Sequence, residues 1–455
     1  MIDFKKFEKY SKPGPRYTSY PTAPEFHTNF TEKDLIQKYQ NQSDDRPLSL
    51  YFHLPFCRSA CYFCGCNVIF TSKEDKKVKY IKYLKKEMDI LKKHLNTNRL
   101  VTQIHFGGGT PTFFSPEQLD EIISYIKQTF PNFAPDVEFS CEVDSRFFTQ
   151  EHMDILKKGG VNRLSFGVQD LDLQVQKTIH RIQPLETTKN VVNIARAAGI
   201  QSINIDLIYG LPYQTKESFK DTIEQIITLD PDRLAVFNYA HVPWMMKTQR
   251  KFDESTFAPP STKLEILKDT INFFTNNGYK MVGMDHFAKP EDELFQAISK
   301  GELHRNFQGY TTKGGADLIG IGVTSIGNGV DYYVQNFKKL EEYESSIDEG
   351  KLPVFKGYSL NDDDILRQYV IMELMSNFSL DIKRCEEKFG INFKEYFSDS
   401  LDALREFEDA NLLTISENKI EANDTGAMLI RNIVMPFDAY LNNIPEDKRR
   451  FSKTI

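Results

Sequence analysis

Apolar residues between positions 48 and 284 follow two alternating spacings, one typical of strands and one typical of helices. Short apolar runs at 48–53 and 101–106 predict strands. Apolar residues that recur every three or four positions over 73–96, from Val78 to Leu95, predict an amphipathic helix. Ser115-Pro116 predicts the start of the next helix, as N-cap and first helical residue. The same patterns predict further strands at 136–143, 162–167, 202–208, 233–237 and 279–284, and further helices at 149–158, 185–198, 215–228 and 261–277.

Repeated strand–helix units predict a parallel sheet covered by helices. Six or so units fit either a partly closed barrel or an open, doubly wound sheet, and periodicity alone does not separate the two. We divide the chain into an N-terminal extension (1–45), an α/β domain (46–357) and a mainly helical C-terminal domain (358–455). The irregular, glycine-rich stretch 285–357 predicts loops and short strands, and 412–422 predicts a hairpin.

Chemically unusual residues follow the ends of the predicted strands. A cysteine-rich loop follows the first strand, GGGTPT (107–112) follows the second, and Glu142-Val-Asp144 closes the third. Gln169-Asp170 follows the fourth, Asp206 lies near the end of the fifth, and 238–241 follows the sixth. The carboxyl ends of parallel strands share one face, where ligands bind. The sequence therefore predicts an active site at this face.

Composition and charge exclude several classes of protein. The chain has 455 residues, of which 40% are apolar, and a net charge of −7, which excludes disordered, collagen and coiled-coil proteins and disfavours general binding of nucleic acid. Residues 361–440 carry 8 basic and 17 acidic side chains, so we expect a structural cover there instead of a DNA-binding winged helix. The N-terminus has no apolar signal segment, and no stretch approaches the roughly 18 apolar residues that cross a bilayer. These features predict a soluble, cytoplasmic protein.

Four of the six cysteines lie within ten residues, in the pattern C-x3-C-x2-C-x-C. A disulfide framework would spread its cysteines along the chain, so the pattern predicts a metal site. Zinc usually takes two separated cysteine pairs and remains the weaker alternative. A [4Fe–4S] cluster explains the spacing better, because three thiolates from one loop leave the fourth iron open to another ligand.

This cysteine loop after a first strand resembles that of the radical S-adenosylmethionine (SAM) superfamily, and GGGT (107–110) resembles its glycine-rich segment. Other segments resemble the oxygen-independent coproporphyrinogen III oxidase family over nearly the whole chain. They are PGPRYTSYPTA (13–23), YFHLPFC (51–57), CYFCGCN (61–67), EVDSR (142–146), GVQD (167–170), NIDLIYGLP (204–212), FNYAH (237–241), GMDHFAKP (283–290), HRNFQGYTT (304–312) and FSKTI (451–455). The resemblance implies an α/β fold with a partial (β/α)6-type barrel, an N-terminal extension and a mainly helical C-terminal domain.

The resemblance also implies a reaction. In the superfamily, the open iron binds SAM, and the reduced cluster cleaves it to methionine and a 5′-deoxyadenosyl radical. The family would use this radical for the oxidative decarboxylation of two propionates of coproporphyrinogen III to vinyls, giving protoporphyrinogen IX in haem biosynthesis. Two SAM molecules, an electron donor such as a flavodoxin or ferredoxin, an unidentified electron acceptor and a monomeric state are implied. Neither nucleic acid nor a membrane span is expected.

Site residues are carried over by position. Cys57, Cys61 and Cys64 would bind the cluster. Two adjacent SAM sites would be lined by Tyr51, Phe63, Gly108, Gly109, Thr110, Glu142, Gln169, Arg181, Asp206, Ala240 and Ile326. Carboxylates suit ribose hydroxyls or an ammonium group and Arg181 suits a carboxylate, although charge pairing at the rim of the sheet is an alternative.

Other side chains have a weaker assignment. Cys66 and Tyr51 are implied to act in catalysis; Cys66 lies too near Cys64 in sequence to reach the same cube, and burial as a small apolar residue is its alternative. Substrate contacts are expected from Arg16, Arg305, Phe307 and Gln308, against simple packing. His53 and His241 are expected to hydrogen-bond near the site instead of binding iron. Cys141 and Cys385 are expected to be buried and inert.

Two other functions compete with this interpretation. A haem-binding protein of the same superfamily would share the barrel, but such relatives generally lack the PRYTSYPTA segment and a cysteine at position 66, and both are present here. An acidic winged-helix regulator with an iron–sulfur sensor would not explain why chemically unusual residues follow so many strand ends. The enzyme is therefore favoured.

Overall fold

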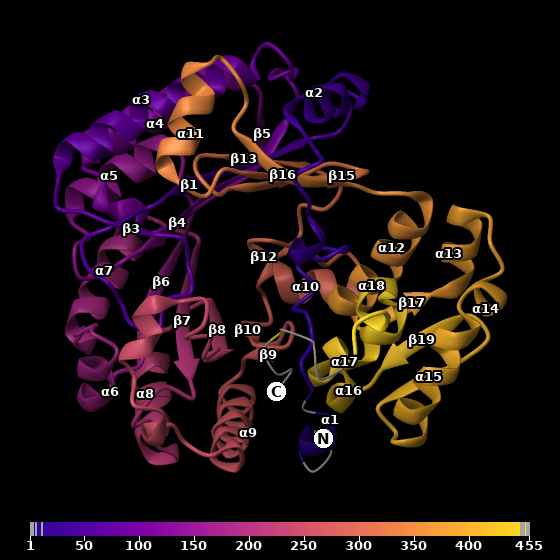
Figure 1. Cartoon of the computed structure of the whole chain (residues 1–455). Coiled ribbons are helices and arrows are strands. Elements are labelled where there is room, and N and C mark those ends of the chain that lie inside the picture. Colours follow the sequence, from indigo (N-terminus) through magenta and orange to yellow (C-terminus); the bar gives the residue numbers. More distant parts are fainter. Residues whose placement is uncertain (1–3, 5–6, 11, 446–450, 452–455) are drawn as a thin grey trace. The chain divides into compact units, whose positions relative to one another are not determined.

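The computed structural model describes residues 4, 7–10, 12–445 and 451, and its chain forms two compact units (Figure 1). The sheet unit comprises Phe26–Lys263 and Gly315–Ser359. The helical unit comprises Met1–Glu25, Leu264–Gly314 and Leu360–Ile455. The predicted division at 45/46 and 357/358 stays a prediction, and most of the FSKTI segment (451–455) lies outside the described residues.

A run of parallel strands in chain order forms the centre of the sheet unit. These strands are β1 (Leu48–Leu54), β4 (Val101–Gly108), β5 (Phe133–Val143), β6 (Arg163–Gln169), β7 (Ser202–Tyr209) and β8 (Arg233–Asn238). On the other side of β1, the sheet continues through parallel β13 (Asp317–Ile321) and antiparallel β14 (Ile326–Asn328), β15 (Tyr332–Asn336) and β16 (Val354–Ser359). The predicted α/β class with a partial barrel is confirmed, and the sheet is open.

Helices connect the parallel strands as predicted. They are α3 (Glu74–Leu91), α4 (Pro116–Thr129), α5 (Gln150–Gly159), α6 (Leu173–Thr178), α7 (Leu185–Ala197) and α8 (Lys216–Ile226). Ser115 is the N-cap of α4: its hydroxyl accepts the Gln118 N–H at 3.3 Å, and the Gln118 side chain accepts the Ser115 N–H at 3.0 Å. The sheet unit also holds α2 (Glu32–Asn41) and α11 (Leu340–Asp348), and β2 (Phe56–Cys57) pairs with β3 (Ile69–Phe70) around the cysteine loop.

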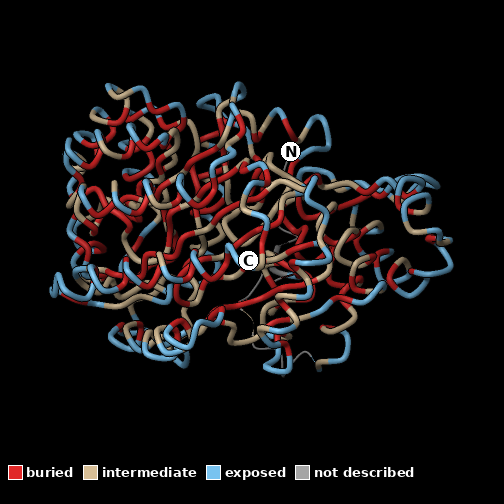
Figure 2. The backbone as a smooth tube through the Cα atoms, turned by 90° about the horizontal axis from the view of Figure 1, so that it is seen from above, coloured by how far each residue is buried: buried red, intermediate tan, exposed pale blue. Residues whose placement is uncertain are grey.

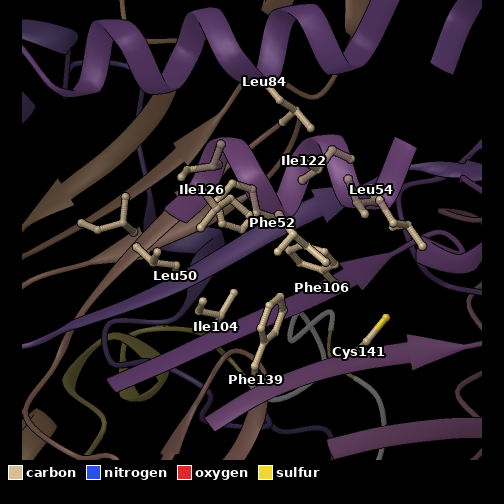
Figure 3. Close-up of a cluster of buried hydrophobic side chains, with 14 of the residues drawn as sticks. Leu50, Phe52, Leu54, Leu84, Ile104, Phe106, Ile122, Ile126, Phe139 and Cys141 are labelled. Carbon is tan, nitrogen blue, oxygen red and sulfur yellow. The ribbon is translucent and has the colours of Figure 1, made fainter. Parts of the chain in front are cut away.

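Alternate residues of the parallel strands face opposite sides of the sheet. Leu50, Phe52 and Leu54 of β1 pack with residues of β4, β5, α3 and α4 in one hydrophobic core (Figure 3). The intervening positions are polar: Tyr51 is in register with His105, and Glu142 is in register with Ser165. Buried residues follow the strands and the inner helix faces (Figure 2). The apolar residues on one face of the sheet pack against the helices, and the polar residues on the other face include the functional groups.

The helical unit is built from three separate stretches of the chain. It contains β9 (Lys280–Met281) paired with β10 (His286–Ala288), α10 (Glu293–Lys300), and β11 (His304–Asn306) paired with β12 (Gly309–Thr311). After α12 (Asp362–Asn377) follow β17 (Ser379–Asp381), α13 (Ile382–Phe389), α14 (Phe393–Tyr396), α15 (Ser398–Asp409), β18 (Leu413–Ile415), β19 (Lys419–Ala422), α16 (Asp424–Met428), α17 (Ile430–Val434) and α18 (Ala439–Asn442). The predicted hairpin at 412–422 is confirmed as β18–β19.

Some predicted boundaries were wrong. The helix predicted at 73–96 ends at Leu91, and the strand predicted at 279–284 shrinks to β9. Beyond β9, Gly283 leaves room for the Tyr310 side chain, because a Cβ there would overlap the Tyr310 hydroxyl. Helix α9 (Pro260–Asn276) begins in the sheet unit and ends in the helical unit. Among the described residues, no helix is long and apolar enough to cross a membrane.

Candidate functional site

A cavity of about 260 Å³ opens in the sheet unit, lined by the cysteine loop and by residues at the ends of successive parallel strands. The convergence predicted from the sequence is therefore present in the structure. Most of the residues carried over by resemblance line it: Cys57, Cys61, Phe63, Cys64, Cys66, Gly108, Gly109, Thr110, Glu142, Gln169, Arg181 and Asp206. Tyr51, Ala240 and Ile326 are not among its lining residues.

The cysteine side chains surround this cavity. Within the described part of the chain, no three His, Cys, Asp or Glu side chains are grouped as a single metal ion would require. Thiols that line one cavity could hold a cluster of several irons. Cys66 is exposed, which does not support its alternative as a buried apolar residue, whereas Cys141 and Cys385 are buried as predicted.

Positive charge is concentrated at Cys61. Arg181 Nη1 lies 3.7 Å and Arg146 Nη2 lies 4.0 Å from the Cys61 Sγ. Asp144 holds both guanidinium groups, with its Oδ2 at 3.3 Å from Arg181 Nη1 and 2.6 Å from Arg146 Nη2. Both guanidinium groups therefore lie beside a sulfur that is predicted to bind iron. The motif EVDSR contained Asp144 and Arg146, but sequence analysis gave neither a role.

The other two predicted ligands also have specific neighbours. Cys57 Sγ lies 3.3 Å from the hydroxyl of Thr110, and burial raises the pKa of this thiol to about 12. Cys64 Sγ accepts the Cys66 N–H at 3.4 Å. Hydrogen bonding by Cys66 lowers the pKa of Cys64 to about 7 against the opposing effect of burial. The loop therefore favours the thiolate at Cys64 before any metal is bound.

Two positions of the glycine run, 108 and 109, have no room for a larger side chain. Gly108 has φ +116, and a Cβ there would lie 2.7 Å from the His53 ring. A Cβ on Gly109 would lie 2.5 Å from the backbone oxygen of Pro55. Only glycine lets this strand end pass so close to the start of the cysteine loop. The resulting exposed backbone fits a cofactor that lies flat against it.

Glu142 links the glycine run to β1. Its carboxylate accepts the Gly108 N–H at 3.2 Å and lies 3.4 Å from His105 Nε2. Burial opposes ionisation of Glu142, but the hydrogen bond and charge of His105 outweigh it and lower the pKa. Tyr51 stacks on His105 with ring centroids 5.7 Å apart, and its hydroxyl lies 3.0 Å from His53 Nδ1. Tyr51 thus contacts residues that hold Glu142, although it does not line the cavity.

The far side of the cavity is formed by β6 and β7. Asp206 accepts hydrogen bonds from Ser165 at 2.9 Å and Asn204 at 2.7 Å. Gln169 adopts φ +75, a conformation that few residues other than glycine adopt. The Arg181 Nη2 donates to the Gly167 oxygen at 2.6 Å, while its buried Nε has no hydrogen-bond partner among the described residues. An unpartnered guanidinium N–H at the cavity fits a carboxylate of a bound molecule.

Ala240 and Ile326 lie on other segments of the chain. Ala240 follows β8, and its backbone oxygen accepts the Gln249 side chain at 3.3 Å. Ile326 begins β14. His53 and His241 hydrogen-bond to protein groups, His53 Nε2 to the Asn67 oxygen at 3.0 Å and His241 Nδ1 to the Tyr239 hydroxyl at 3.1 Å. These contacts agree with the expected hydrogen-bonding role of both histidines.

The predicted substrate residues all lie in the helical unit. Arg16 Nη1 is 3.9 Å from Asp285 Oδ2, and the Arg305 guanidinium lies 4.7 Å from the centre of the Tyr310 ring. Arg305 Nε and Nη1 and the Gln308 Oε1 are buried without hydrogen-bond partners among the described residues. Phe307 precedes Gln308 in the turn between β11 and β12.

Sequence analysis missed another arginine in this group. Burial, followed by the charge of Arg16, lowers the pKa of Arg431 to about 9. Asp285 is held ionised: burial opposes this, but His286 and then the arginines depress its pKa. No motif in the sequence marked Arg431. The group therefore combines several guanidinium charges with the carboxylate of Asp285, an excess that suits an acidic ligand.

Comparisons with known proteins agree with this site. Family models match at residues 51–226, for the Radical SAM superfamily, and 360–429, for the HemN C-terminal domain. The chain is 58% identical over 457 residues to the oxygen-independent coproporphyrinogen III oxidase of Helicobacter pylori (strain J99), covering 100% of this chain and 99% of that protein. Identity to the Escherichia coli (strain K12) protein of the same name is 44% over 453 residues, with 100% and 98% covered.

A solved structure extends this likeness to three dimensions. Coproporphyrinogen III oxidase (HemN) from Escherichia coli, described as a radical SAM enzyme, matches with a TM-score of 0.92 at 42% identity, covering 97% of this chain and 99% of that chain. The resemblance inferred from the sequence motifs is thus confirmed. With its full-length relatives and its cysteine-lined cavity, the chain belongs to the oxygen-independent coproporphyrinogen III oxidase family of the radical SAM superfamily.

Proposed function

We propose that this chain catalyses the oxidative decarboxylation of two propionate side chains of coproporphyrinogen III to vinyl groups, giving protoporphyrinogen IX in haem biosynthesis. One observation carries the proposal: the cysteine loop, the glycine run and Glu142 line one cavity in a chain with full-length relatives of that name. The haem-binding alternative has no specific observation in its favour.

Membership of the radical SAM superfamily implies a [4Fe–4S] cluster and SAM, and the cavity residues fit both. When bound, the pair supplies a 5′-deoxyadenosyl radical that removes a hydrogen atom from a propionate β-carbon. Cys57, Cys61 and Cys64 would hold the cluster. The free Arg181 Nε would bind the SAM carboxylate, and Glu142, held ionised by His105, would accept an ammonium or ribose hydroxyl.

A second bound SAM molecule is part of the proposal because the family resemblance implies it, and the reaction consumes two SAM molecules, one for each propionate. The lining residues Phe63, Gly109, Thr110, Gln169 and Asp206 are candidates to bind either molecule. Tyr51, Ala240 and Ile326 remain candidates from outside the cavity. Tyr51 and Cys66 are proposed to act in catalysis, Cys66 without binding iron.

Carboxylates of the substrate are proposed to bind the arginine group of the helical unit. Arg305 offers buried, unsatisfied N–H donors, and Gln308 offers an unsatisfied acceptor. A buried donor without a partner costs about 1–3 kcal/mol, so a carboxylate that fills the site recovers this cost. Arg16 and Arg431 add charge beside Asp285, and Phe307 is proposed to contact a pyrrole face.

The reaction sets the partners. A one-electron donor such as a flavodoxin or ferredoxin must reduce the cluster, and an acceptor not yet identified must take an electron as CO2 leaves. We infer a monomer that works in the cytoplasm.

The test is anaerobic reconstitution of the cluster, followed by addition of SAM, a strong reductant, an electron acceptor and coproporphyrinogen III. Mass spectrometry would follow 5′-deoxyadenosine, the mono-vinyl intermediate and protoporphyrinogen IX. We expect product from the wild type and none from Cys61→Ala. Cys385→Ala, which changes a buried cysteine of the helical unit, is the matched control and keeps activity. SAM cleavage without any change in the tetrapyrrole would refute the substrate, and an intact cluster without cleavage would favour the haem-binding alternative.

A further inference from the structure

Glu87 on α3 is a fully buried carboxylate in the sheet unit, 3% exposed. It accepts hydrogen bonds from the Gly322 N–H at 2.8 Å, the Asn336 side-chain amide at 2.7 Å and the Tyr343 hydroxyl at 2.5 Å. These partners carry no positive charge. Burial of an ionisable group without a cation is costly, and hydrogen bonds only partly offset the cost. A glutamine or methionine would fill the same space, so the carboxylate calls for an explanation.

The carboxylate fixes a tight turn at 322–325, directly after β13. Gly322 has φ +101 and Thr324 has φ +63, both in the left-handed region. The Gly322 oxygen accepts the Ser325 hydroxyl at 2.7 Å and the Asn336 amide at 2.9 Å. Asn336 therefore bridges Glu87 and the Gly322 oxygen, and both backbone polar groups of Gly322 are held.

This turn lies against the strand that leads to the cysteine loop. A Cβ on Gly322 would lie 2.8 Å from the His53 oxygen. The Tyr80 hydroxyl, two helical turns before Glu87 on α3, accepts the Val323 N–H at 3.0 Å and donates to the His53 oxygen at 2.8 Å. One face of α3 thus holds both the turn and the backbone of His53.

His53 carries the contact onward to the candidate site. Its ring lies 3.0 Å from the Tyr51 hydroxyl on one side and 3.0 Å from the Asn67 oxygen on the other. Asn67 directly follows Cys66 in the cysteine loop. At the other end of the turn, Ile326 enters β14 against Gly320, where a Cβ would lie 2.7 Å from the Ile326 oxygen.

We propose that Glu87 is a positioning residue for the radical reaction, whose carboxylate holds the turn 322–325 and, through Tyr80 and His53, sets the placement of the cysteine loop. The proposal rests on the proposed function. The group acts through others and touches neither cofactor nor substrate. Its effect should therefore appear in the binding of SAM and in the order of the turn, beyond any loss of stability.

Glu87→Gln is the sharpest variant, because it keeps the shape. One amide oxygen can still accept from Gly322 or Tyr343, but the new NH2 faces the Asn336 amide donor. Asn336 cannot rotate to offer its oxygen without bringing that oxygen against the Gly322 oxygen. Glu87→Met removes every acceptor. Ile122→Ala, which opens core volume on α4, is the matched control for lost stability alone.

The first measurement uses the cluster-free protein and needs no activity. Hydrogen–deuterium exchange of the amides at 320–327 should rise in Glu87→Gln and Glu87→Met, while it stays at the wild-type level in Ile122→Ala. The second uses the reconstituted protein: the dissociation constant for SAM should rise about tenfold in Glu87→Gln, because the altered turn is transmitted through Tyr80 and His53 to the cysteine loop. In Ile122→Ala it should stay within twofold.

Exchange at 320–327 and SAM affinity equal to those of Ile122→Ala in both Glu87 variants would overturn the proposal. Loss of thermal stability alone, with normal SAM binding, would also overturn it, since a merely structural residue behaves so. A wild type that binds no SAM would refute the proposed function, while the exchange measurement would still decide whether Glu87 holds the turn.

Discussion

Two buried carboxylates of the sheet unit, Asp317 and Glu87, are satisfied in opposite ways. Asp317 begins β13 and pairs with Arg99 at 2.5 Å and Arg46 at 2.8 Å, residues that precede β4 and β1. Glu87 bonds just past the other end of β13, to uncharged donors. In parallel α/β folds the amino ends of strands serve stability and the carboxyl ends serve function. The contrast shows two ways to satisfy a buried carboxylate: an ion pair at the amino end of β13, and uncharged hydrogen-bond donors at and beyond its carboxyl end.

The largest effect is expected from breaking the ion pair. Asp317→Asn leaves two guanidinium groups, one of them buried, without their carboxylate, so the free energy of unfolding should fall by about 3–5 kcal/mol. Urea denaturation of the cluster-free protein measures this. SAM cleavage per folded molecule should stay near that of the wild type. A selective loss of SAM binding in this variant would contradict the idea that the amino end of β13 serves stability and its carboxyl end serves function.

The pH dependence of stability should differ between wild type and Glu87→Gln. Burial raises the pKa of Glu87 to about 7 from an unfolded value of 4.5, so this group contributes stability that is complete below pH 4.5 and is lost as the pH rises through 7. Relative to Glu87→Gln, the wild type should lose up to about 3 kcal/mol between pH 4.5 and pH 7.5. Denaturation across this range tests it, and a constant difference would contradict it.

Asp144 sharpens the comparison, because its ion pairs with Arg146 and Arg181 lie at the carboxyl ends of the parallel strands, beside the candidate site. Arg181→Met removes a guanidinium that Asp144 holds beside Cys61, and the dissociation constant for SAM should rise about 10–100-fold through loss of a charged hydrogen bond. Thermal unfolding of the cluster-free protein should shift far less than in Asp317→Asn. Equal destabilisation by Arg181→Met and Asp317→Asn would show that the stability contributed by an ion pair does not depend on the end of the strands at which it lies.

The smallest effect is expected from Tyr343→Phe. This change removes one donor that lowers the pKa of Glu87, so the pH midpoint of its stability profile should move upward. The free energy of unfolding at pH 7 should fall by about 1 kcal/mol. An unchanged midpoint would mean that the Tyr343 hydroxyl does not govern the ionisation of Glu87.

The sequence predicted the succession of strands and helices well, and also the functional residues at the strand ends, because turn residues and apolar runs are local signals. It left barrel and doubly wound sheets unresolved, although the alternation of Leu50, Tyr51, Phe52 and His53 already indicates a sheet with one polar face. Residues on this face, such as His105 and Ser165, could have been found by that signal.

Other features of the site are set by tertiary contacts and have no local signature. On α3, Val78 belongs to the apolar spacing that predicted the helix but is 42% exposed, whereas Tyr80 and Glu87 are buried. Helical spacing marks apolar residues and cannot show that a glutamate turns inward toward a loop more than 230 residues away in sequence. Arg431 likewise lies more than 100 residues in sequence from Arg16, Asp285 and Arg305, the motif residues with which it groups.

The pairing of β1 with β13 sets an order of events during synthesis. Residues 48–54 leave the ribosome long before 317–321, so until then β1 has β4 on one side and an open edge on the other. The turn at 322–325 that lies against His53 is made later still. Nascent chains therefore carry the complete cysteine motif well before its supporting framework exists, and an iron cluster inserted during translation would meet an unfinished site. Loading after release of the chain avoids this.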